Sequence, residues 1–183
     1  MKANQELLLA LMGYIIRETE ISDVEQLLLV ERSAGSVFKS LPGLAWIADD
    51  SVISAEEHKS LLAKGFSWVA LDFLSQAICG FIHAEIIEGE FYVGEVSVCE
   101  TYQKKGIGSK LLKTALTQAK SLGLSTATLT TFIDVPWNAP YYQRLGFVII
   151  PEDTLPRYLE RKLQEEKSAG LPLDRRCAMR KKL

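Results

Sequence analysis

The sequence is poor in the residues that build disulfide frameworks and metal sites. Among its 183 residues there are only three cysteines, Cys79, Cys99 and Cys177, and two histidines, His58 and His83. The cysteines are odd in number and widely spaced, which is typical of a reduced, cytoplasmic chain. No pair of these residues has the spacing of a zinc site, so the sequence predicts no metal and no cysteine–histidine nucleophile.

A surplus of basic residues is also missing. The formal net charge is −2, and the basic residues are concentrated after Arg157, so the rest of the chain is acidic. Because affinity for nucleic acid comes from clustered positive charge, this distribution argues against a nucleic-acid partner. We expect the basic end to be a solvated face, and contact with an acidic partner remains an alternative.

The sequence contains no apolar run long enough to cross a membrane. The run at 7–16 is interrupted by Gly13 and continues directly into Arg17, which predicts the approach to a first strand rather than a signal peptide. Hydrophobic content of 48% and charged content of 24% are ordinary for a globular protein. We therefore expect a single domain over 1–183, with a core at about 13–150 and a C-terminal helix and last strand within 151–183.

Hydrophobic periodicity and turn residues predict a mixed order of helices and strands. Ser22 and Asp23 are expected to cap the first helix, Ser54 and Glu57 form a capping-box pattern at the second, and Leu122 lies on the apolar stripe of the third. The predicted strands are 14–17, 66–73, 78–87, 95–98, 125–131, 147–150 and 177–182. The predicted helices cover 22–34, 136–144 and 153–169; one more helix starts at 54, and another runs from the glycines at 106 and 108 to 122. The segment 36–50 is predicted to be a loop.

A glycine-containing loop connects the strand at 95–98 to the helix that follows it. The loop reads Gln-Lys-Lys-Gly-Ile-Gly over 103–108. Glycines at the first turn of a helix, beside lysines, are typical of a site for a phosphate or another anion, although a plain tight turn is the alternative. A dinucleotide fingerprint would need a small residue where Leu111 stands, and no P-loop sequence occurs, so a nucleotide-binding regulator is a weaker interpretation.

Two motifs in this order resemble the GNAT superfamily of acyl-CoA-dependent N-acetyltransferases. The first is Gln-x-x-Gly-x-Gly after a valine-containing strand, and the second is the segment Trp-Asn-Ala-Pro-Tyr-Tyr-Gln-Arg-Leu-Gly-Phe at 137–147. The resemblance covers about 13–150 and is sharpest over 94–147. It implies an α/β fold with a mixed, mostly antiparallel central sheet, helices on its faces, and a splayed pair of strands that binds the coenzyme.

The resemblance also implies a cosubstrate, acetyl-CoA, and a set of site residues. Tyr142 stands where the family has a general acid for the departing thiolate, and a phenol suits that task because it stays protonated at neutral pH. Asn138 resembles the family's coenzyme-contacting asparagine, although it lies closer to the tyrosine than is usual. The remaining expected coenzyme contacts are Val96, Val98, Gln103, Lys104, Lys105, Gly106, Ile107, Gly108 and Ser109.

The general base is expected to be a carboxylate on the strand that leads into the loop. Our choice is Glu95, whose pKa would rise if the side chain were partly buried, and Glu85, Glu90 and Asp134 are the reserves. Strand alternation places Glu95 on the face opposite Val96 and Val98. The same region, with Glu88, suggests that the acceptor is a cation.

Taken together, these observations predict an enzyme that transfers the acetyl group of acetyl-CoA directly to a primary amine of a small molecule or peptide. The alternative is a protein of the same fold that binds acyl-CoA without catalysis, as a sensor or interaction module. The sequence leaves open the acceptor, the length of the acyl chain and the formation of a homodimer.

Overall fold

The computed structural model describes residues 13–50 and 52–183, which form two compact units. The first unit contains the described part of 1–84 together with 95–115, and the second contains 85–94 and 116–183. The chain passes between the units within two strands and one helix. Most of the apolar run at 7–16, namely 7–12, lies outside the described residues.

The chain forms seven strands and five α-helices over the described residues, with short 3-10 helices between them. The strands are β1 (Tyr14–Glu18), β2 (Phe66–Asp72), β3 (Ile78–Ile87), β4 (Glu90–Val98), β5 (Thr126–Phe132), β6 (Val148–Ile149) and β7 (Arg176–Lys182). The α-helices are α2 (Val24–Gly35), α3 (Ala55–Lys64), α4 (Ile107–Ser121), α5 (Ala139–Arg144) and α6 (Arg157–Ser168). The 3-10 helices are η1 (Ile21–Asp23), η2 (Ser36–Ser40), η3 (Ala45–Asp49), η4 (Glu100–Tyr102), η5 (Glu152–Thr154) and η6 (Leu173–Arg175).

The strands are hydrogen-bonded in the order β1-β2-β3-β4-β5-β7-β6. The β4–β5 pair is parallel, whereas the β1–β2, β2–β3, β5–β7 and β6–β7 pairs are antiparallel. The register of the parallel pair runs only over Phe91–Val93 and Ala127–Leu129, although both strands extend further. This is the mixed, mostly antiparallel sheet flanked by helices that the sequence predicted.

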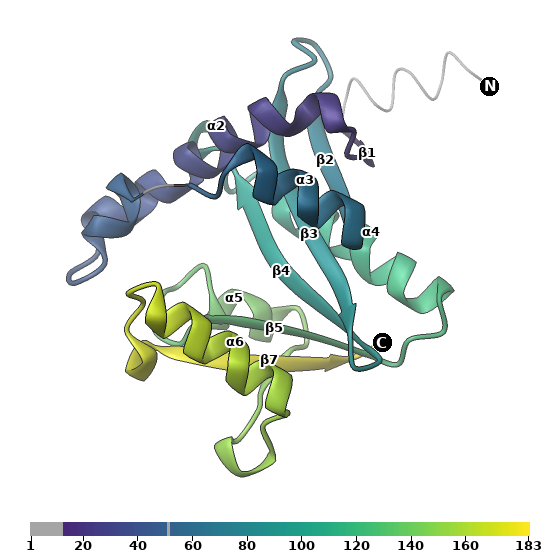
Figure 1. Cartoon of the computed structure of the whole chain (residues 1–183). Coiled ribbons are helices and arrows are strands. Elements are labelled where there is room, and N and C mark those ends of the chain that lie inside the picture. The colour runs from purple at the N-terminus through teal and green to yellow at the C-terminus, as the bar shows by residue number, and fades with distance from the viewer. Residues whose placement is uncertain (1–12, 51) are drawn as a thin grey trace. The chain divides into compact units, whose positions relative to one another are not determined.

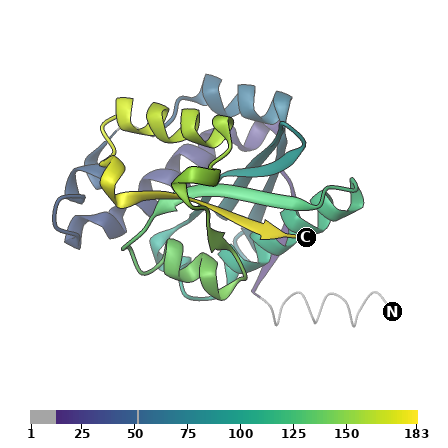
Figure 2. The same cartoon turned by 90° about the horizontal axis from the view of Figure 1, so that it is seen from below.

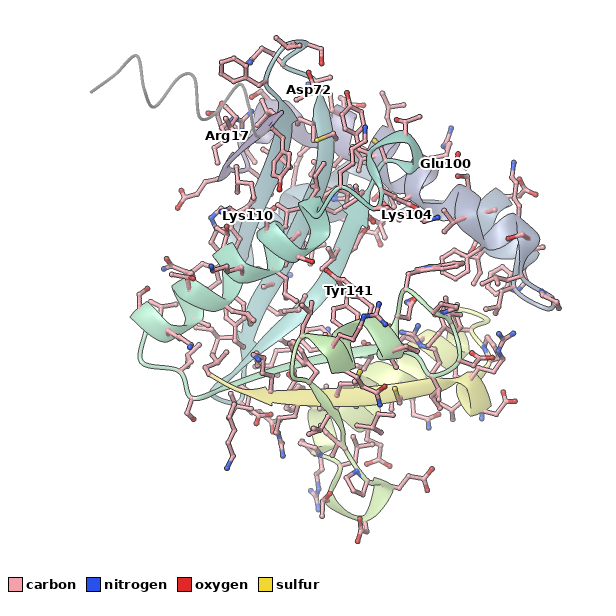
Figure 3. The ribbon with its side chains drawn as sticks, turned by 180° about the vertical axis from the view of Figure 1, so that it is seen from behind. Arg17, Asp72, Glu100, Lys104, Lys110 and Tyr141 are labelled. Carbon is pink, nitrogen blue, oxygen red and sulfur yellow. The ribbon has the colours of Figure 1, made fainter. Side chains whose placement is uncertain are left out.

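In the first unit, helices cover both faces of the strands. Helices α2 and α3 lie on one face, and the beginning of α4 lies on the other (Figures 1 and 3). Under α2, the side chains of Leu27, Val30, Val69, Leu71, Ile78 and Phe81 form a buried cluster. On the face toward α4, a Cβ on Gly80 would lie 3.2 Å from Val98 and 3.3 Å from Ile107, so the glycine permits the close approach of this helix.

In the second unit, α5 and α6 lie on opposite faces of β5 and β7 (Figures 1 and 2). The core under α6 contains Tyr92, Ile150, Tyr158, Leu159, Leu163 and Ala178. The C-terminal strand β7 is not at the edge of the sheet, because it pairs with β5 along its whole length and with β6 on its other side. The basic residues of this strand therefore belong to a sheet and not to an extended tail.

Several predicted boundaries differ from the structure. The first helix is not capped by Ser22, because the carboxylate of Asp23 accepts hydrogen bonds from the Glu20 backbone and from Arg17. Leu122 was wrongly placed on the buried stripe of α4, since it lies after the last turn and is 45% exposed. Helix α6 begins later than predicted because Pro156 precedes its first residue and disfavours helical geometry before it.

Other boundaries follow from local chemistry. The segment predicted as a loop at 36–50 contains η2 and η3. Strand β4 begins at Glu90 rather than at Glu95, since Glu88 and Gly89 both have positive φ and form a two-residue hairpin turn. The capping box predicted for α3 is present: Ser54 accepts a hydrogen bond from the Glu57 N–H, and the Glu57 carboxylate accepts one from the Ser54 N–H.

Candidate active site

The glycine loop of the first unit lies between η4 and the first turn of α4. Figure 3 labels Glu100, Lys104 and Lys110 along this segment. Lys104 and Gly106 have φ values of 60° and 81°, and no atom lies within 4 Å of the position that a Cβ on Gly106 would take. The loop therefore presents open main chain at a helix N-terminus, which is where an anion can approach.

The first turn of α4 has backbone N–H groups that can donate hydrogen bonds to a bound anion. The bond from the Lys110 N–H to the Gly106 carbonyl is the first that follows the helical i to i−4 pattern in this segment. The N–H groups of Ile107 and Gly108 precede it, at positions where a helix supplies no carbonyl partner of its own. The Ile107 side chain is buried, so its contribution to an anion site would come from its backbone.

The side chains of the loop have two different roles. The Gln103 side-chain amide donates to the Val98 carbonyl at 3.0 Å, so it holds the loop against its own strand. The Lys105 ammonium lies 4.8 Å from the centre of the Tyr102 ring. Lys104, Lys105 and Gly106 are all exposed. The exposed lysines add positive charge beside the helix N-terminus.

Glu95 lies on β4, three residues before its end, and is partly buried. Its Oε1 accepts a hydrogen bond from the Ser97 hydroxyl at 2.7 Å, so the two side chains share one face of the strand. Val98, whose methyl group points toward Gly80 and α4, lies on the other face. Burial, with a smaller contribution from the charge of Glu31, raises the pKa of Glu95 to about 8. At neutral pH this carboxyl group therefore holds a proton far more readily than an ordinary glutamate.

The first unit also contains titratable residues that the sequence did not identify as part of a site. Glu31 of α2 lies 3.3 Å from His58 of α3, and His58 lies 3.0 Å from His83 of β3. In the sequence, the two histidines stood out only as possible metal ligands or catalytic partners of a cysteine. Their positions inside an apolar helix face and an apolar strand were the only available signal.

The carboxylates that were reserves for the base all form ion pairs in the second unit. Glu85 pairs with Lys162 at 3.2 Å, Glu90 with Arg180 at 3.2 Å, and Asp134 with Arg175 at 2.7 Å. Glu88, from the same acidic region, pairs with Arg161 at 3.3 Å. Because these groups are already neutralised by cations of their own unit, they give little support to the inference of a cationic acceptor.

Asn138 precedes α5 and keeps a buried acceptor. Its side-chain N–H donates to the Thr131 hydroxyl at 3.0 Å. Its Oδ1 is buried and has no hydrogen-bond partner within 13–50 and 52–183. A buried carbonyl oxygen without a donor is costly, so this position is suited to receive an N–H from a bound molecule, such as an amide of the pantetheine arm.

Tyr142 lies one turn further along, within α5 (Figure 3 labels its neighbour Tyr141). Its ring contacts those of Tyr141 and Phe147 at centroid distances of 5.2 and 5.8 Å. Burial raises the pKa of the Tyr142 phenol, so the group stays protonated at neutral pH. Within the described part of the chain, its hydroxyl makes no hydrogen bond, and it is therefore not committed to another acceptor.

Metal sites and membrane-spanning helices are not found among the described residues. Among residues 13–50 and 52–183, no group of three or more histidine, cysteine, aspartate or glutamate side chains could hold a metal ion. None of the helices in the described segments combines the length and the apolar character that a membrane span requires.

Solved structures of acetyltransferases share this fold. PaiA N-acetyltransferase from Thermoplasma acidophilum, in complex with coenzyme A, is 21% identical over 93% of this chain and 99% of its own, with a TM-score of 0.67. An acetyltransferase from Streptococcus agalactiae gives 19% identity, the same coverage and a TM-score of 0.68. The ribosomal-protein-S18-alanine N-acetyltransferase from Escherichia coli gives 16% identity over 92% and 93%, with a TM-score of 0.63.

The sequence itself matches a family model. The model described as the acetyltransferase (GNAT) family matches residues 39–147, which is more than half of the chain and includes both motifs. This confirms the resemblance on which the coenzyme was predicted, and acetyl-CoA fits the family as cosubstrate. The chain therefore belongs to the acetyltransferase (GNAT) family, a membership that supports acyl-CoA-dependent acetyl transfer as its class of reaction.

Proposed function

We propose that the protein transfers the acetyl group of acetyl-CoA directly to a primary amine of a small molecule or peptide. The observation that carries this proposal is Glu95, a partly buried carboxyl group with a raised pKa, on the strand that leads into the glycine loop. Such a group can take a proton from an amine that would otherwise be charged and unreactive. The three free cysteines suit the reducing cytoplasm as the place of the reaction.

The coenzyme would be held by main chain and by a few polar atoms. The backbone at 103–109 would bind the pyrophosphate, with Lys104 and Lys105 adding positive charge. The edge of β4 around Val96 and Val98 would share its hydrogen-bonding groups with the amides of the pantetheine arm. The buried Oδ1 of Asn138 would accept one further amide N–H. With the pyrophosphate and the pantetheine arm held in this way, the thioester is the part of acetyl-CoA that reacts.

The first chemical requirement is a neutral amine. Free alkyl ammonium groups have a pKa near 10, so an acceptor is charged at neutral pH. Glu95 would accept this proton, directly or through a water molecule, and the amine lone pair would then attack the thioester carbonyl. The carbon–nitrogen bond forms as the carbonyl becomes a tetrahedral oxyanion, and the nitrogen, now positively charged, releases a second proton to solvent as the amide forms. Glu95 returns the proton it accepted to solvent before the next cycle.

The second requirement is a proton for the leaving group. When the tetrahedral intermediate collapses, the carbon–sulfur bond breaks and coenzyme A departs as a thiolate. Tyr142 would donate its phenolic proton to that sulfur and recover a proton from solvent before the next cycle. Its raised pKa keeps the proton available, and its uncommitted hydroxyl can turn toward the sulfur.

The names of two proteins of similar fold point to amine acceptors. One is named for the alanine of ribosomal protein S18, and another structure contains N-acetyl-glutamate with coenzyme A. The two names refer to different acceptors, but both refer to an acetyl group on nitrogen. Since loops that bind acceptors vary on a shared scaffold, a panel of amines is the appropriate test.

The experiment measures thermal unfolding and turnover on the same preparation. Acetyl-CoA and coenzyme A should each raise the midpoint of unfolding, because a ligand at 100 times its Kd adds about 2.7 kcal/mol. NAD and ATP should not raise it. Release of free thiol is then followed with diamines, amino acids and peptides with a free N-terminus. Stabilisation without turnover on any amine would favour the acyl-CoA sensor, and stabilisation by NAD or ATP alone would favour a nucleotide-binding regulator.

A further inference from the structure

A buried row of titratable side chains in the first unit has no role in the function proposed above. Glu31 of α2, His58 of α3 and His83 of β3 follow one another across the helix-covered face of the sheet. His58 is fully buried, and His83 is 3% exposed. The His58 ring also packs edge-on against Phe81 at a centroid distance of 5.6 Å. Two imidazoles placed this deep in an apolar core need a reason beyond packing, because burial penalises polar groups.

The charge of Glu31 fixes where the protons of this row lie. One carboxylate oxygen of Glu31 accepts from the Ile53 N–H at 3.2 Å, and the other is buried 3.3 Å from Nε2 of His58. A carboxylate favours a proton on the nitrogen that faces it, so His58 carries its hydrogen on Nε2. Nδ1 of His58 is then an acceptor, and it receives the hydrogen on Nε2 of His83 at 3.0 Å.

The far end of the row stays neutral. Burial, together with the neighbouring His58, lowers the pKa of His83 to about 3, so His83 does not become a cation at neutral pH. Its Nδ1 is buried and has no partner in the described segments. The row therefore places His58 3.3 Å from the Glu31 carboxylate and ends in a neutral histidine.

Glu31 and Glu95 lie on the same side of the first unit. Helix α2 contacts η4, which follows β4, because the Ser33 hydroxyl accepts from the Glu100 N–H at 3.1 Å. Glu95 and Ser97 lie on the face of β4 opposite Val98, which points toward α4. That leaves them on the face covered by α2 and α3.

The titratable groups named on this face come from each element packed there. They are Glu31 from α2, His58 from α3, His83 from β3 and Glu95 from β4 itself. The carboxylate of Glu100 lies further along, where it accepts from the Ser36 hydroxyl. Glu95 thus shares its surroundings with a second carboxylate, with His58, which lies 3.3 Å from that carboxylate, and with His83, which is hydrogen-bonded to His58.

Resting on the proposed function, we propose that Glu31 is a positioning residue for Glu95, a negative charge placed against His58 that makes Glu95 a stronger proton acceptor. In the step concerned, an ammonium acceptor and the Glu95 carboxylate become a neutral amine and a protonated Glu95. A second negative charge nearby favours the protonated product, because two carboxylates in a poorly solvated site repel each other. The raised pKa of Glu95 agrees with this, because the charge of Glu31 contributes to it after burial.

The test is the pH dependence of kcat/KM in three variants. In Glu31→Gln the charge is lost, so the acidic limb of the profile should move to lower pH by about one unit, a typical size for such perturbations. The rate on the plateau should fall severalfold because Glu95 becomes a weaker base. Glu31→Asp keeps the charge and should shift the limb less. Glu25→Gln removes an exposed carboxylate from the same helix and should leave the profile unchanged.

A titration that needs no acetyl transfer separates this inference from the proposed function. Carbon-13 NMR of the glutamate carboxyl groups, with the Glu95 signal assigned from Glu95→Gln, should show its midpoint lower in Glu31→Gln than in wild type. If this midpoint moves but no amine is acetylated, the electrostatic pairing stands and the proposed function fails. If amines are acetylated and neither the midpoint nor the limb moves, the role of Glu31 is refuted. Should Glu31→Gln not fold, Glu31→Ala removes the same charge, and an unchanged Glu95 midpoint in that variant would refute the role equally.

Discussion

The two units of the protein use the same residue type in opposite ways. In the second unit, carboxylates are matched with cations: Glu85, Glu90 and Glu166 contact Lys162, Arg180 and Arg176 respectively. In the first unit, Glu95 contacts a serine hydroxyl and Glu31 contacts a histidine. Both units bury these carboxylates partly, so burial alone does not separate the two cases.

The difference lies in the partner and not in the carboxylate. A glutamate against an arginine is favoured in its charged form, and it contributes to the sheet as a structural ion pair. A buried glutamate with no cation beside it, such as Glu95, is favoured in its protonated form, and a nearby carboxylate adds to this preference. The first arrangement fixes structure, whereas the second allows a proton to be taken up and released.

The largest expected effect is on turnover in Glu95→Gln. The amide cannot accept a proton, so kcat with an amine acceptor should fall about 10³-fold, within the range for loss of a general base. Thiol release under saturating acetyl-CoA is the measurement. Glu100→Gln is the matched control, because this exposed carboxylate follows the same strand and has no assigned chemistry. A Glu95→Gln enzyme with nearly full activity would remove Glu95 from the mechanism.

The second effect is on stability, in Glu166→Ala. The Glu166 carboxylate accepts two hydrogen bonds from Arg176, at 2.7 and 2.9 Å, and Arg176 is only 9% exposed. Removing the carboxylate leaves a buried guanidinium uncompensated, so the free energy of unfolding should fall by about 3 kcal/mol. Urea unfolding measures this value. In the control Glu88→Gln, the broken pair is exposed and should cost less than about 1 kcal/mol.

A third effect, on the leaving group, is expected in Tyr142→Phe. Loss of the phenolic proton should lower kcat about 10²-fold, while the Kd of coenzyme A should change by less than about twofold, because general acid catalysis acts on the transition state. Tyr141→Phe is the control from the same helix and should retain most of the activity. Equal losses in the two variants would indicate that the rings act by packing alone.

A fourth effect concerns the pH dependence of stability. The pKa of Glu95 rises from its ordinary value of 4.5 to about 8 on folding, so the folded state binds more protons than the unfolded state between these values. Stability should therefore fall as pH rises through this window. In Glu95→Gln, this part of the decline should be absent, so the two proteins should diverge progressively above pH 4.5. Parallel curves from urea unfolding at several pH values would contradict the raised pKa.

The smallest effect is expected for the exposed loop charge. Lys104→Ala should weaken coenzyme A binding only about two- to threefold, because an exposed ammonium near a phosphate is screened by water and salt. The difference from wild type should shrink further at high ionic strength. Lys120→Ala, at the other end of α4, is the control. A loss of more than about tenfold would mean that Lys104 contacts the phosphate in a much less solvated site than the loop suggests.

Much of the local structure could be read from short stretches of sequence. The Ser54 and Glu57 capping box, the strand ending at Val98 and the glycine loop depend on neighbours within a few residues, and all were predicted. Asp23 shows where this reading fails. Its carboxylate reaches Arg17 of β1 as well as the Glu20 backbone, and a partner on another element competes with a simple helix cap.

The candidate site could likewise be predicted only in part. The sequence identified Glu95, Tyr142 and the loop, because each stands within a recognisable motif or at a fixed place relative to one. It also named Glu85, Glu90 and Asp134 as equivalent reserves, since a list of residues does not show which carboxylates meet a cation. The structure separates them, because each of the three has a lysine or arginine partner.

The sequence by itself determined the order of the elements and the glycine loop, because these follow from periodicity and spacing along the chain, and it determined the family through two motifs that resemble those of known members. Only the tertiary structure decided the protonation of the acidic residues. The packing of α2 and α3 on the sheet brings together Glu31, His58 and His83, which lie far apart in sequence. The pKa of a carboxyl group depends on its solvation and on charges a few ångströms away, and both are set by packing rather than by neighbours in the chain.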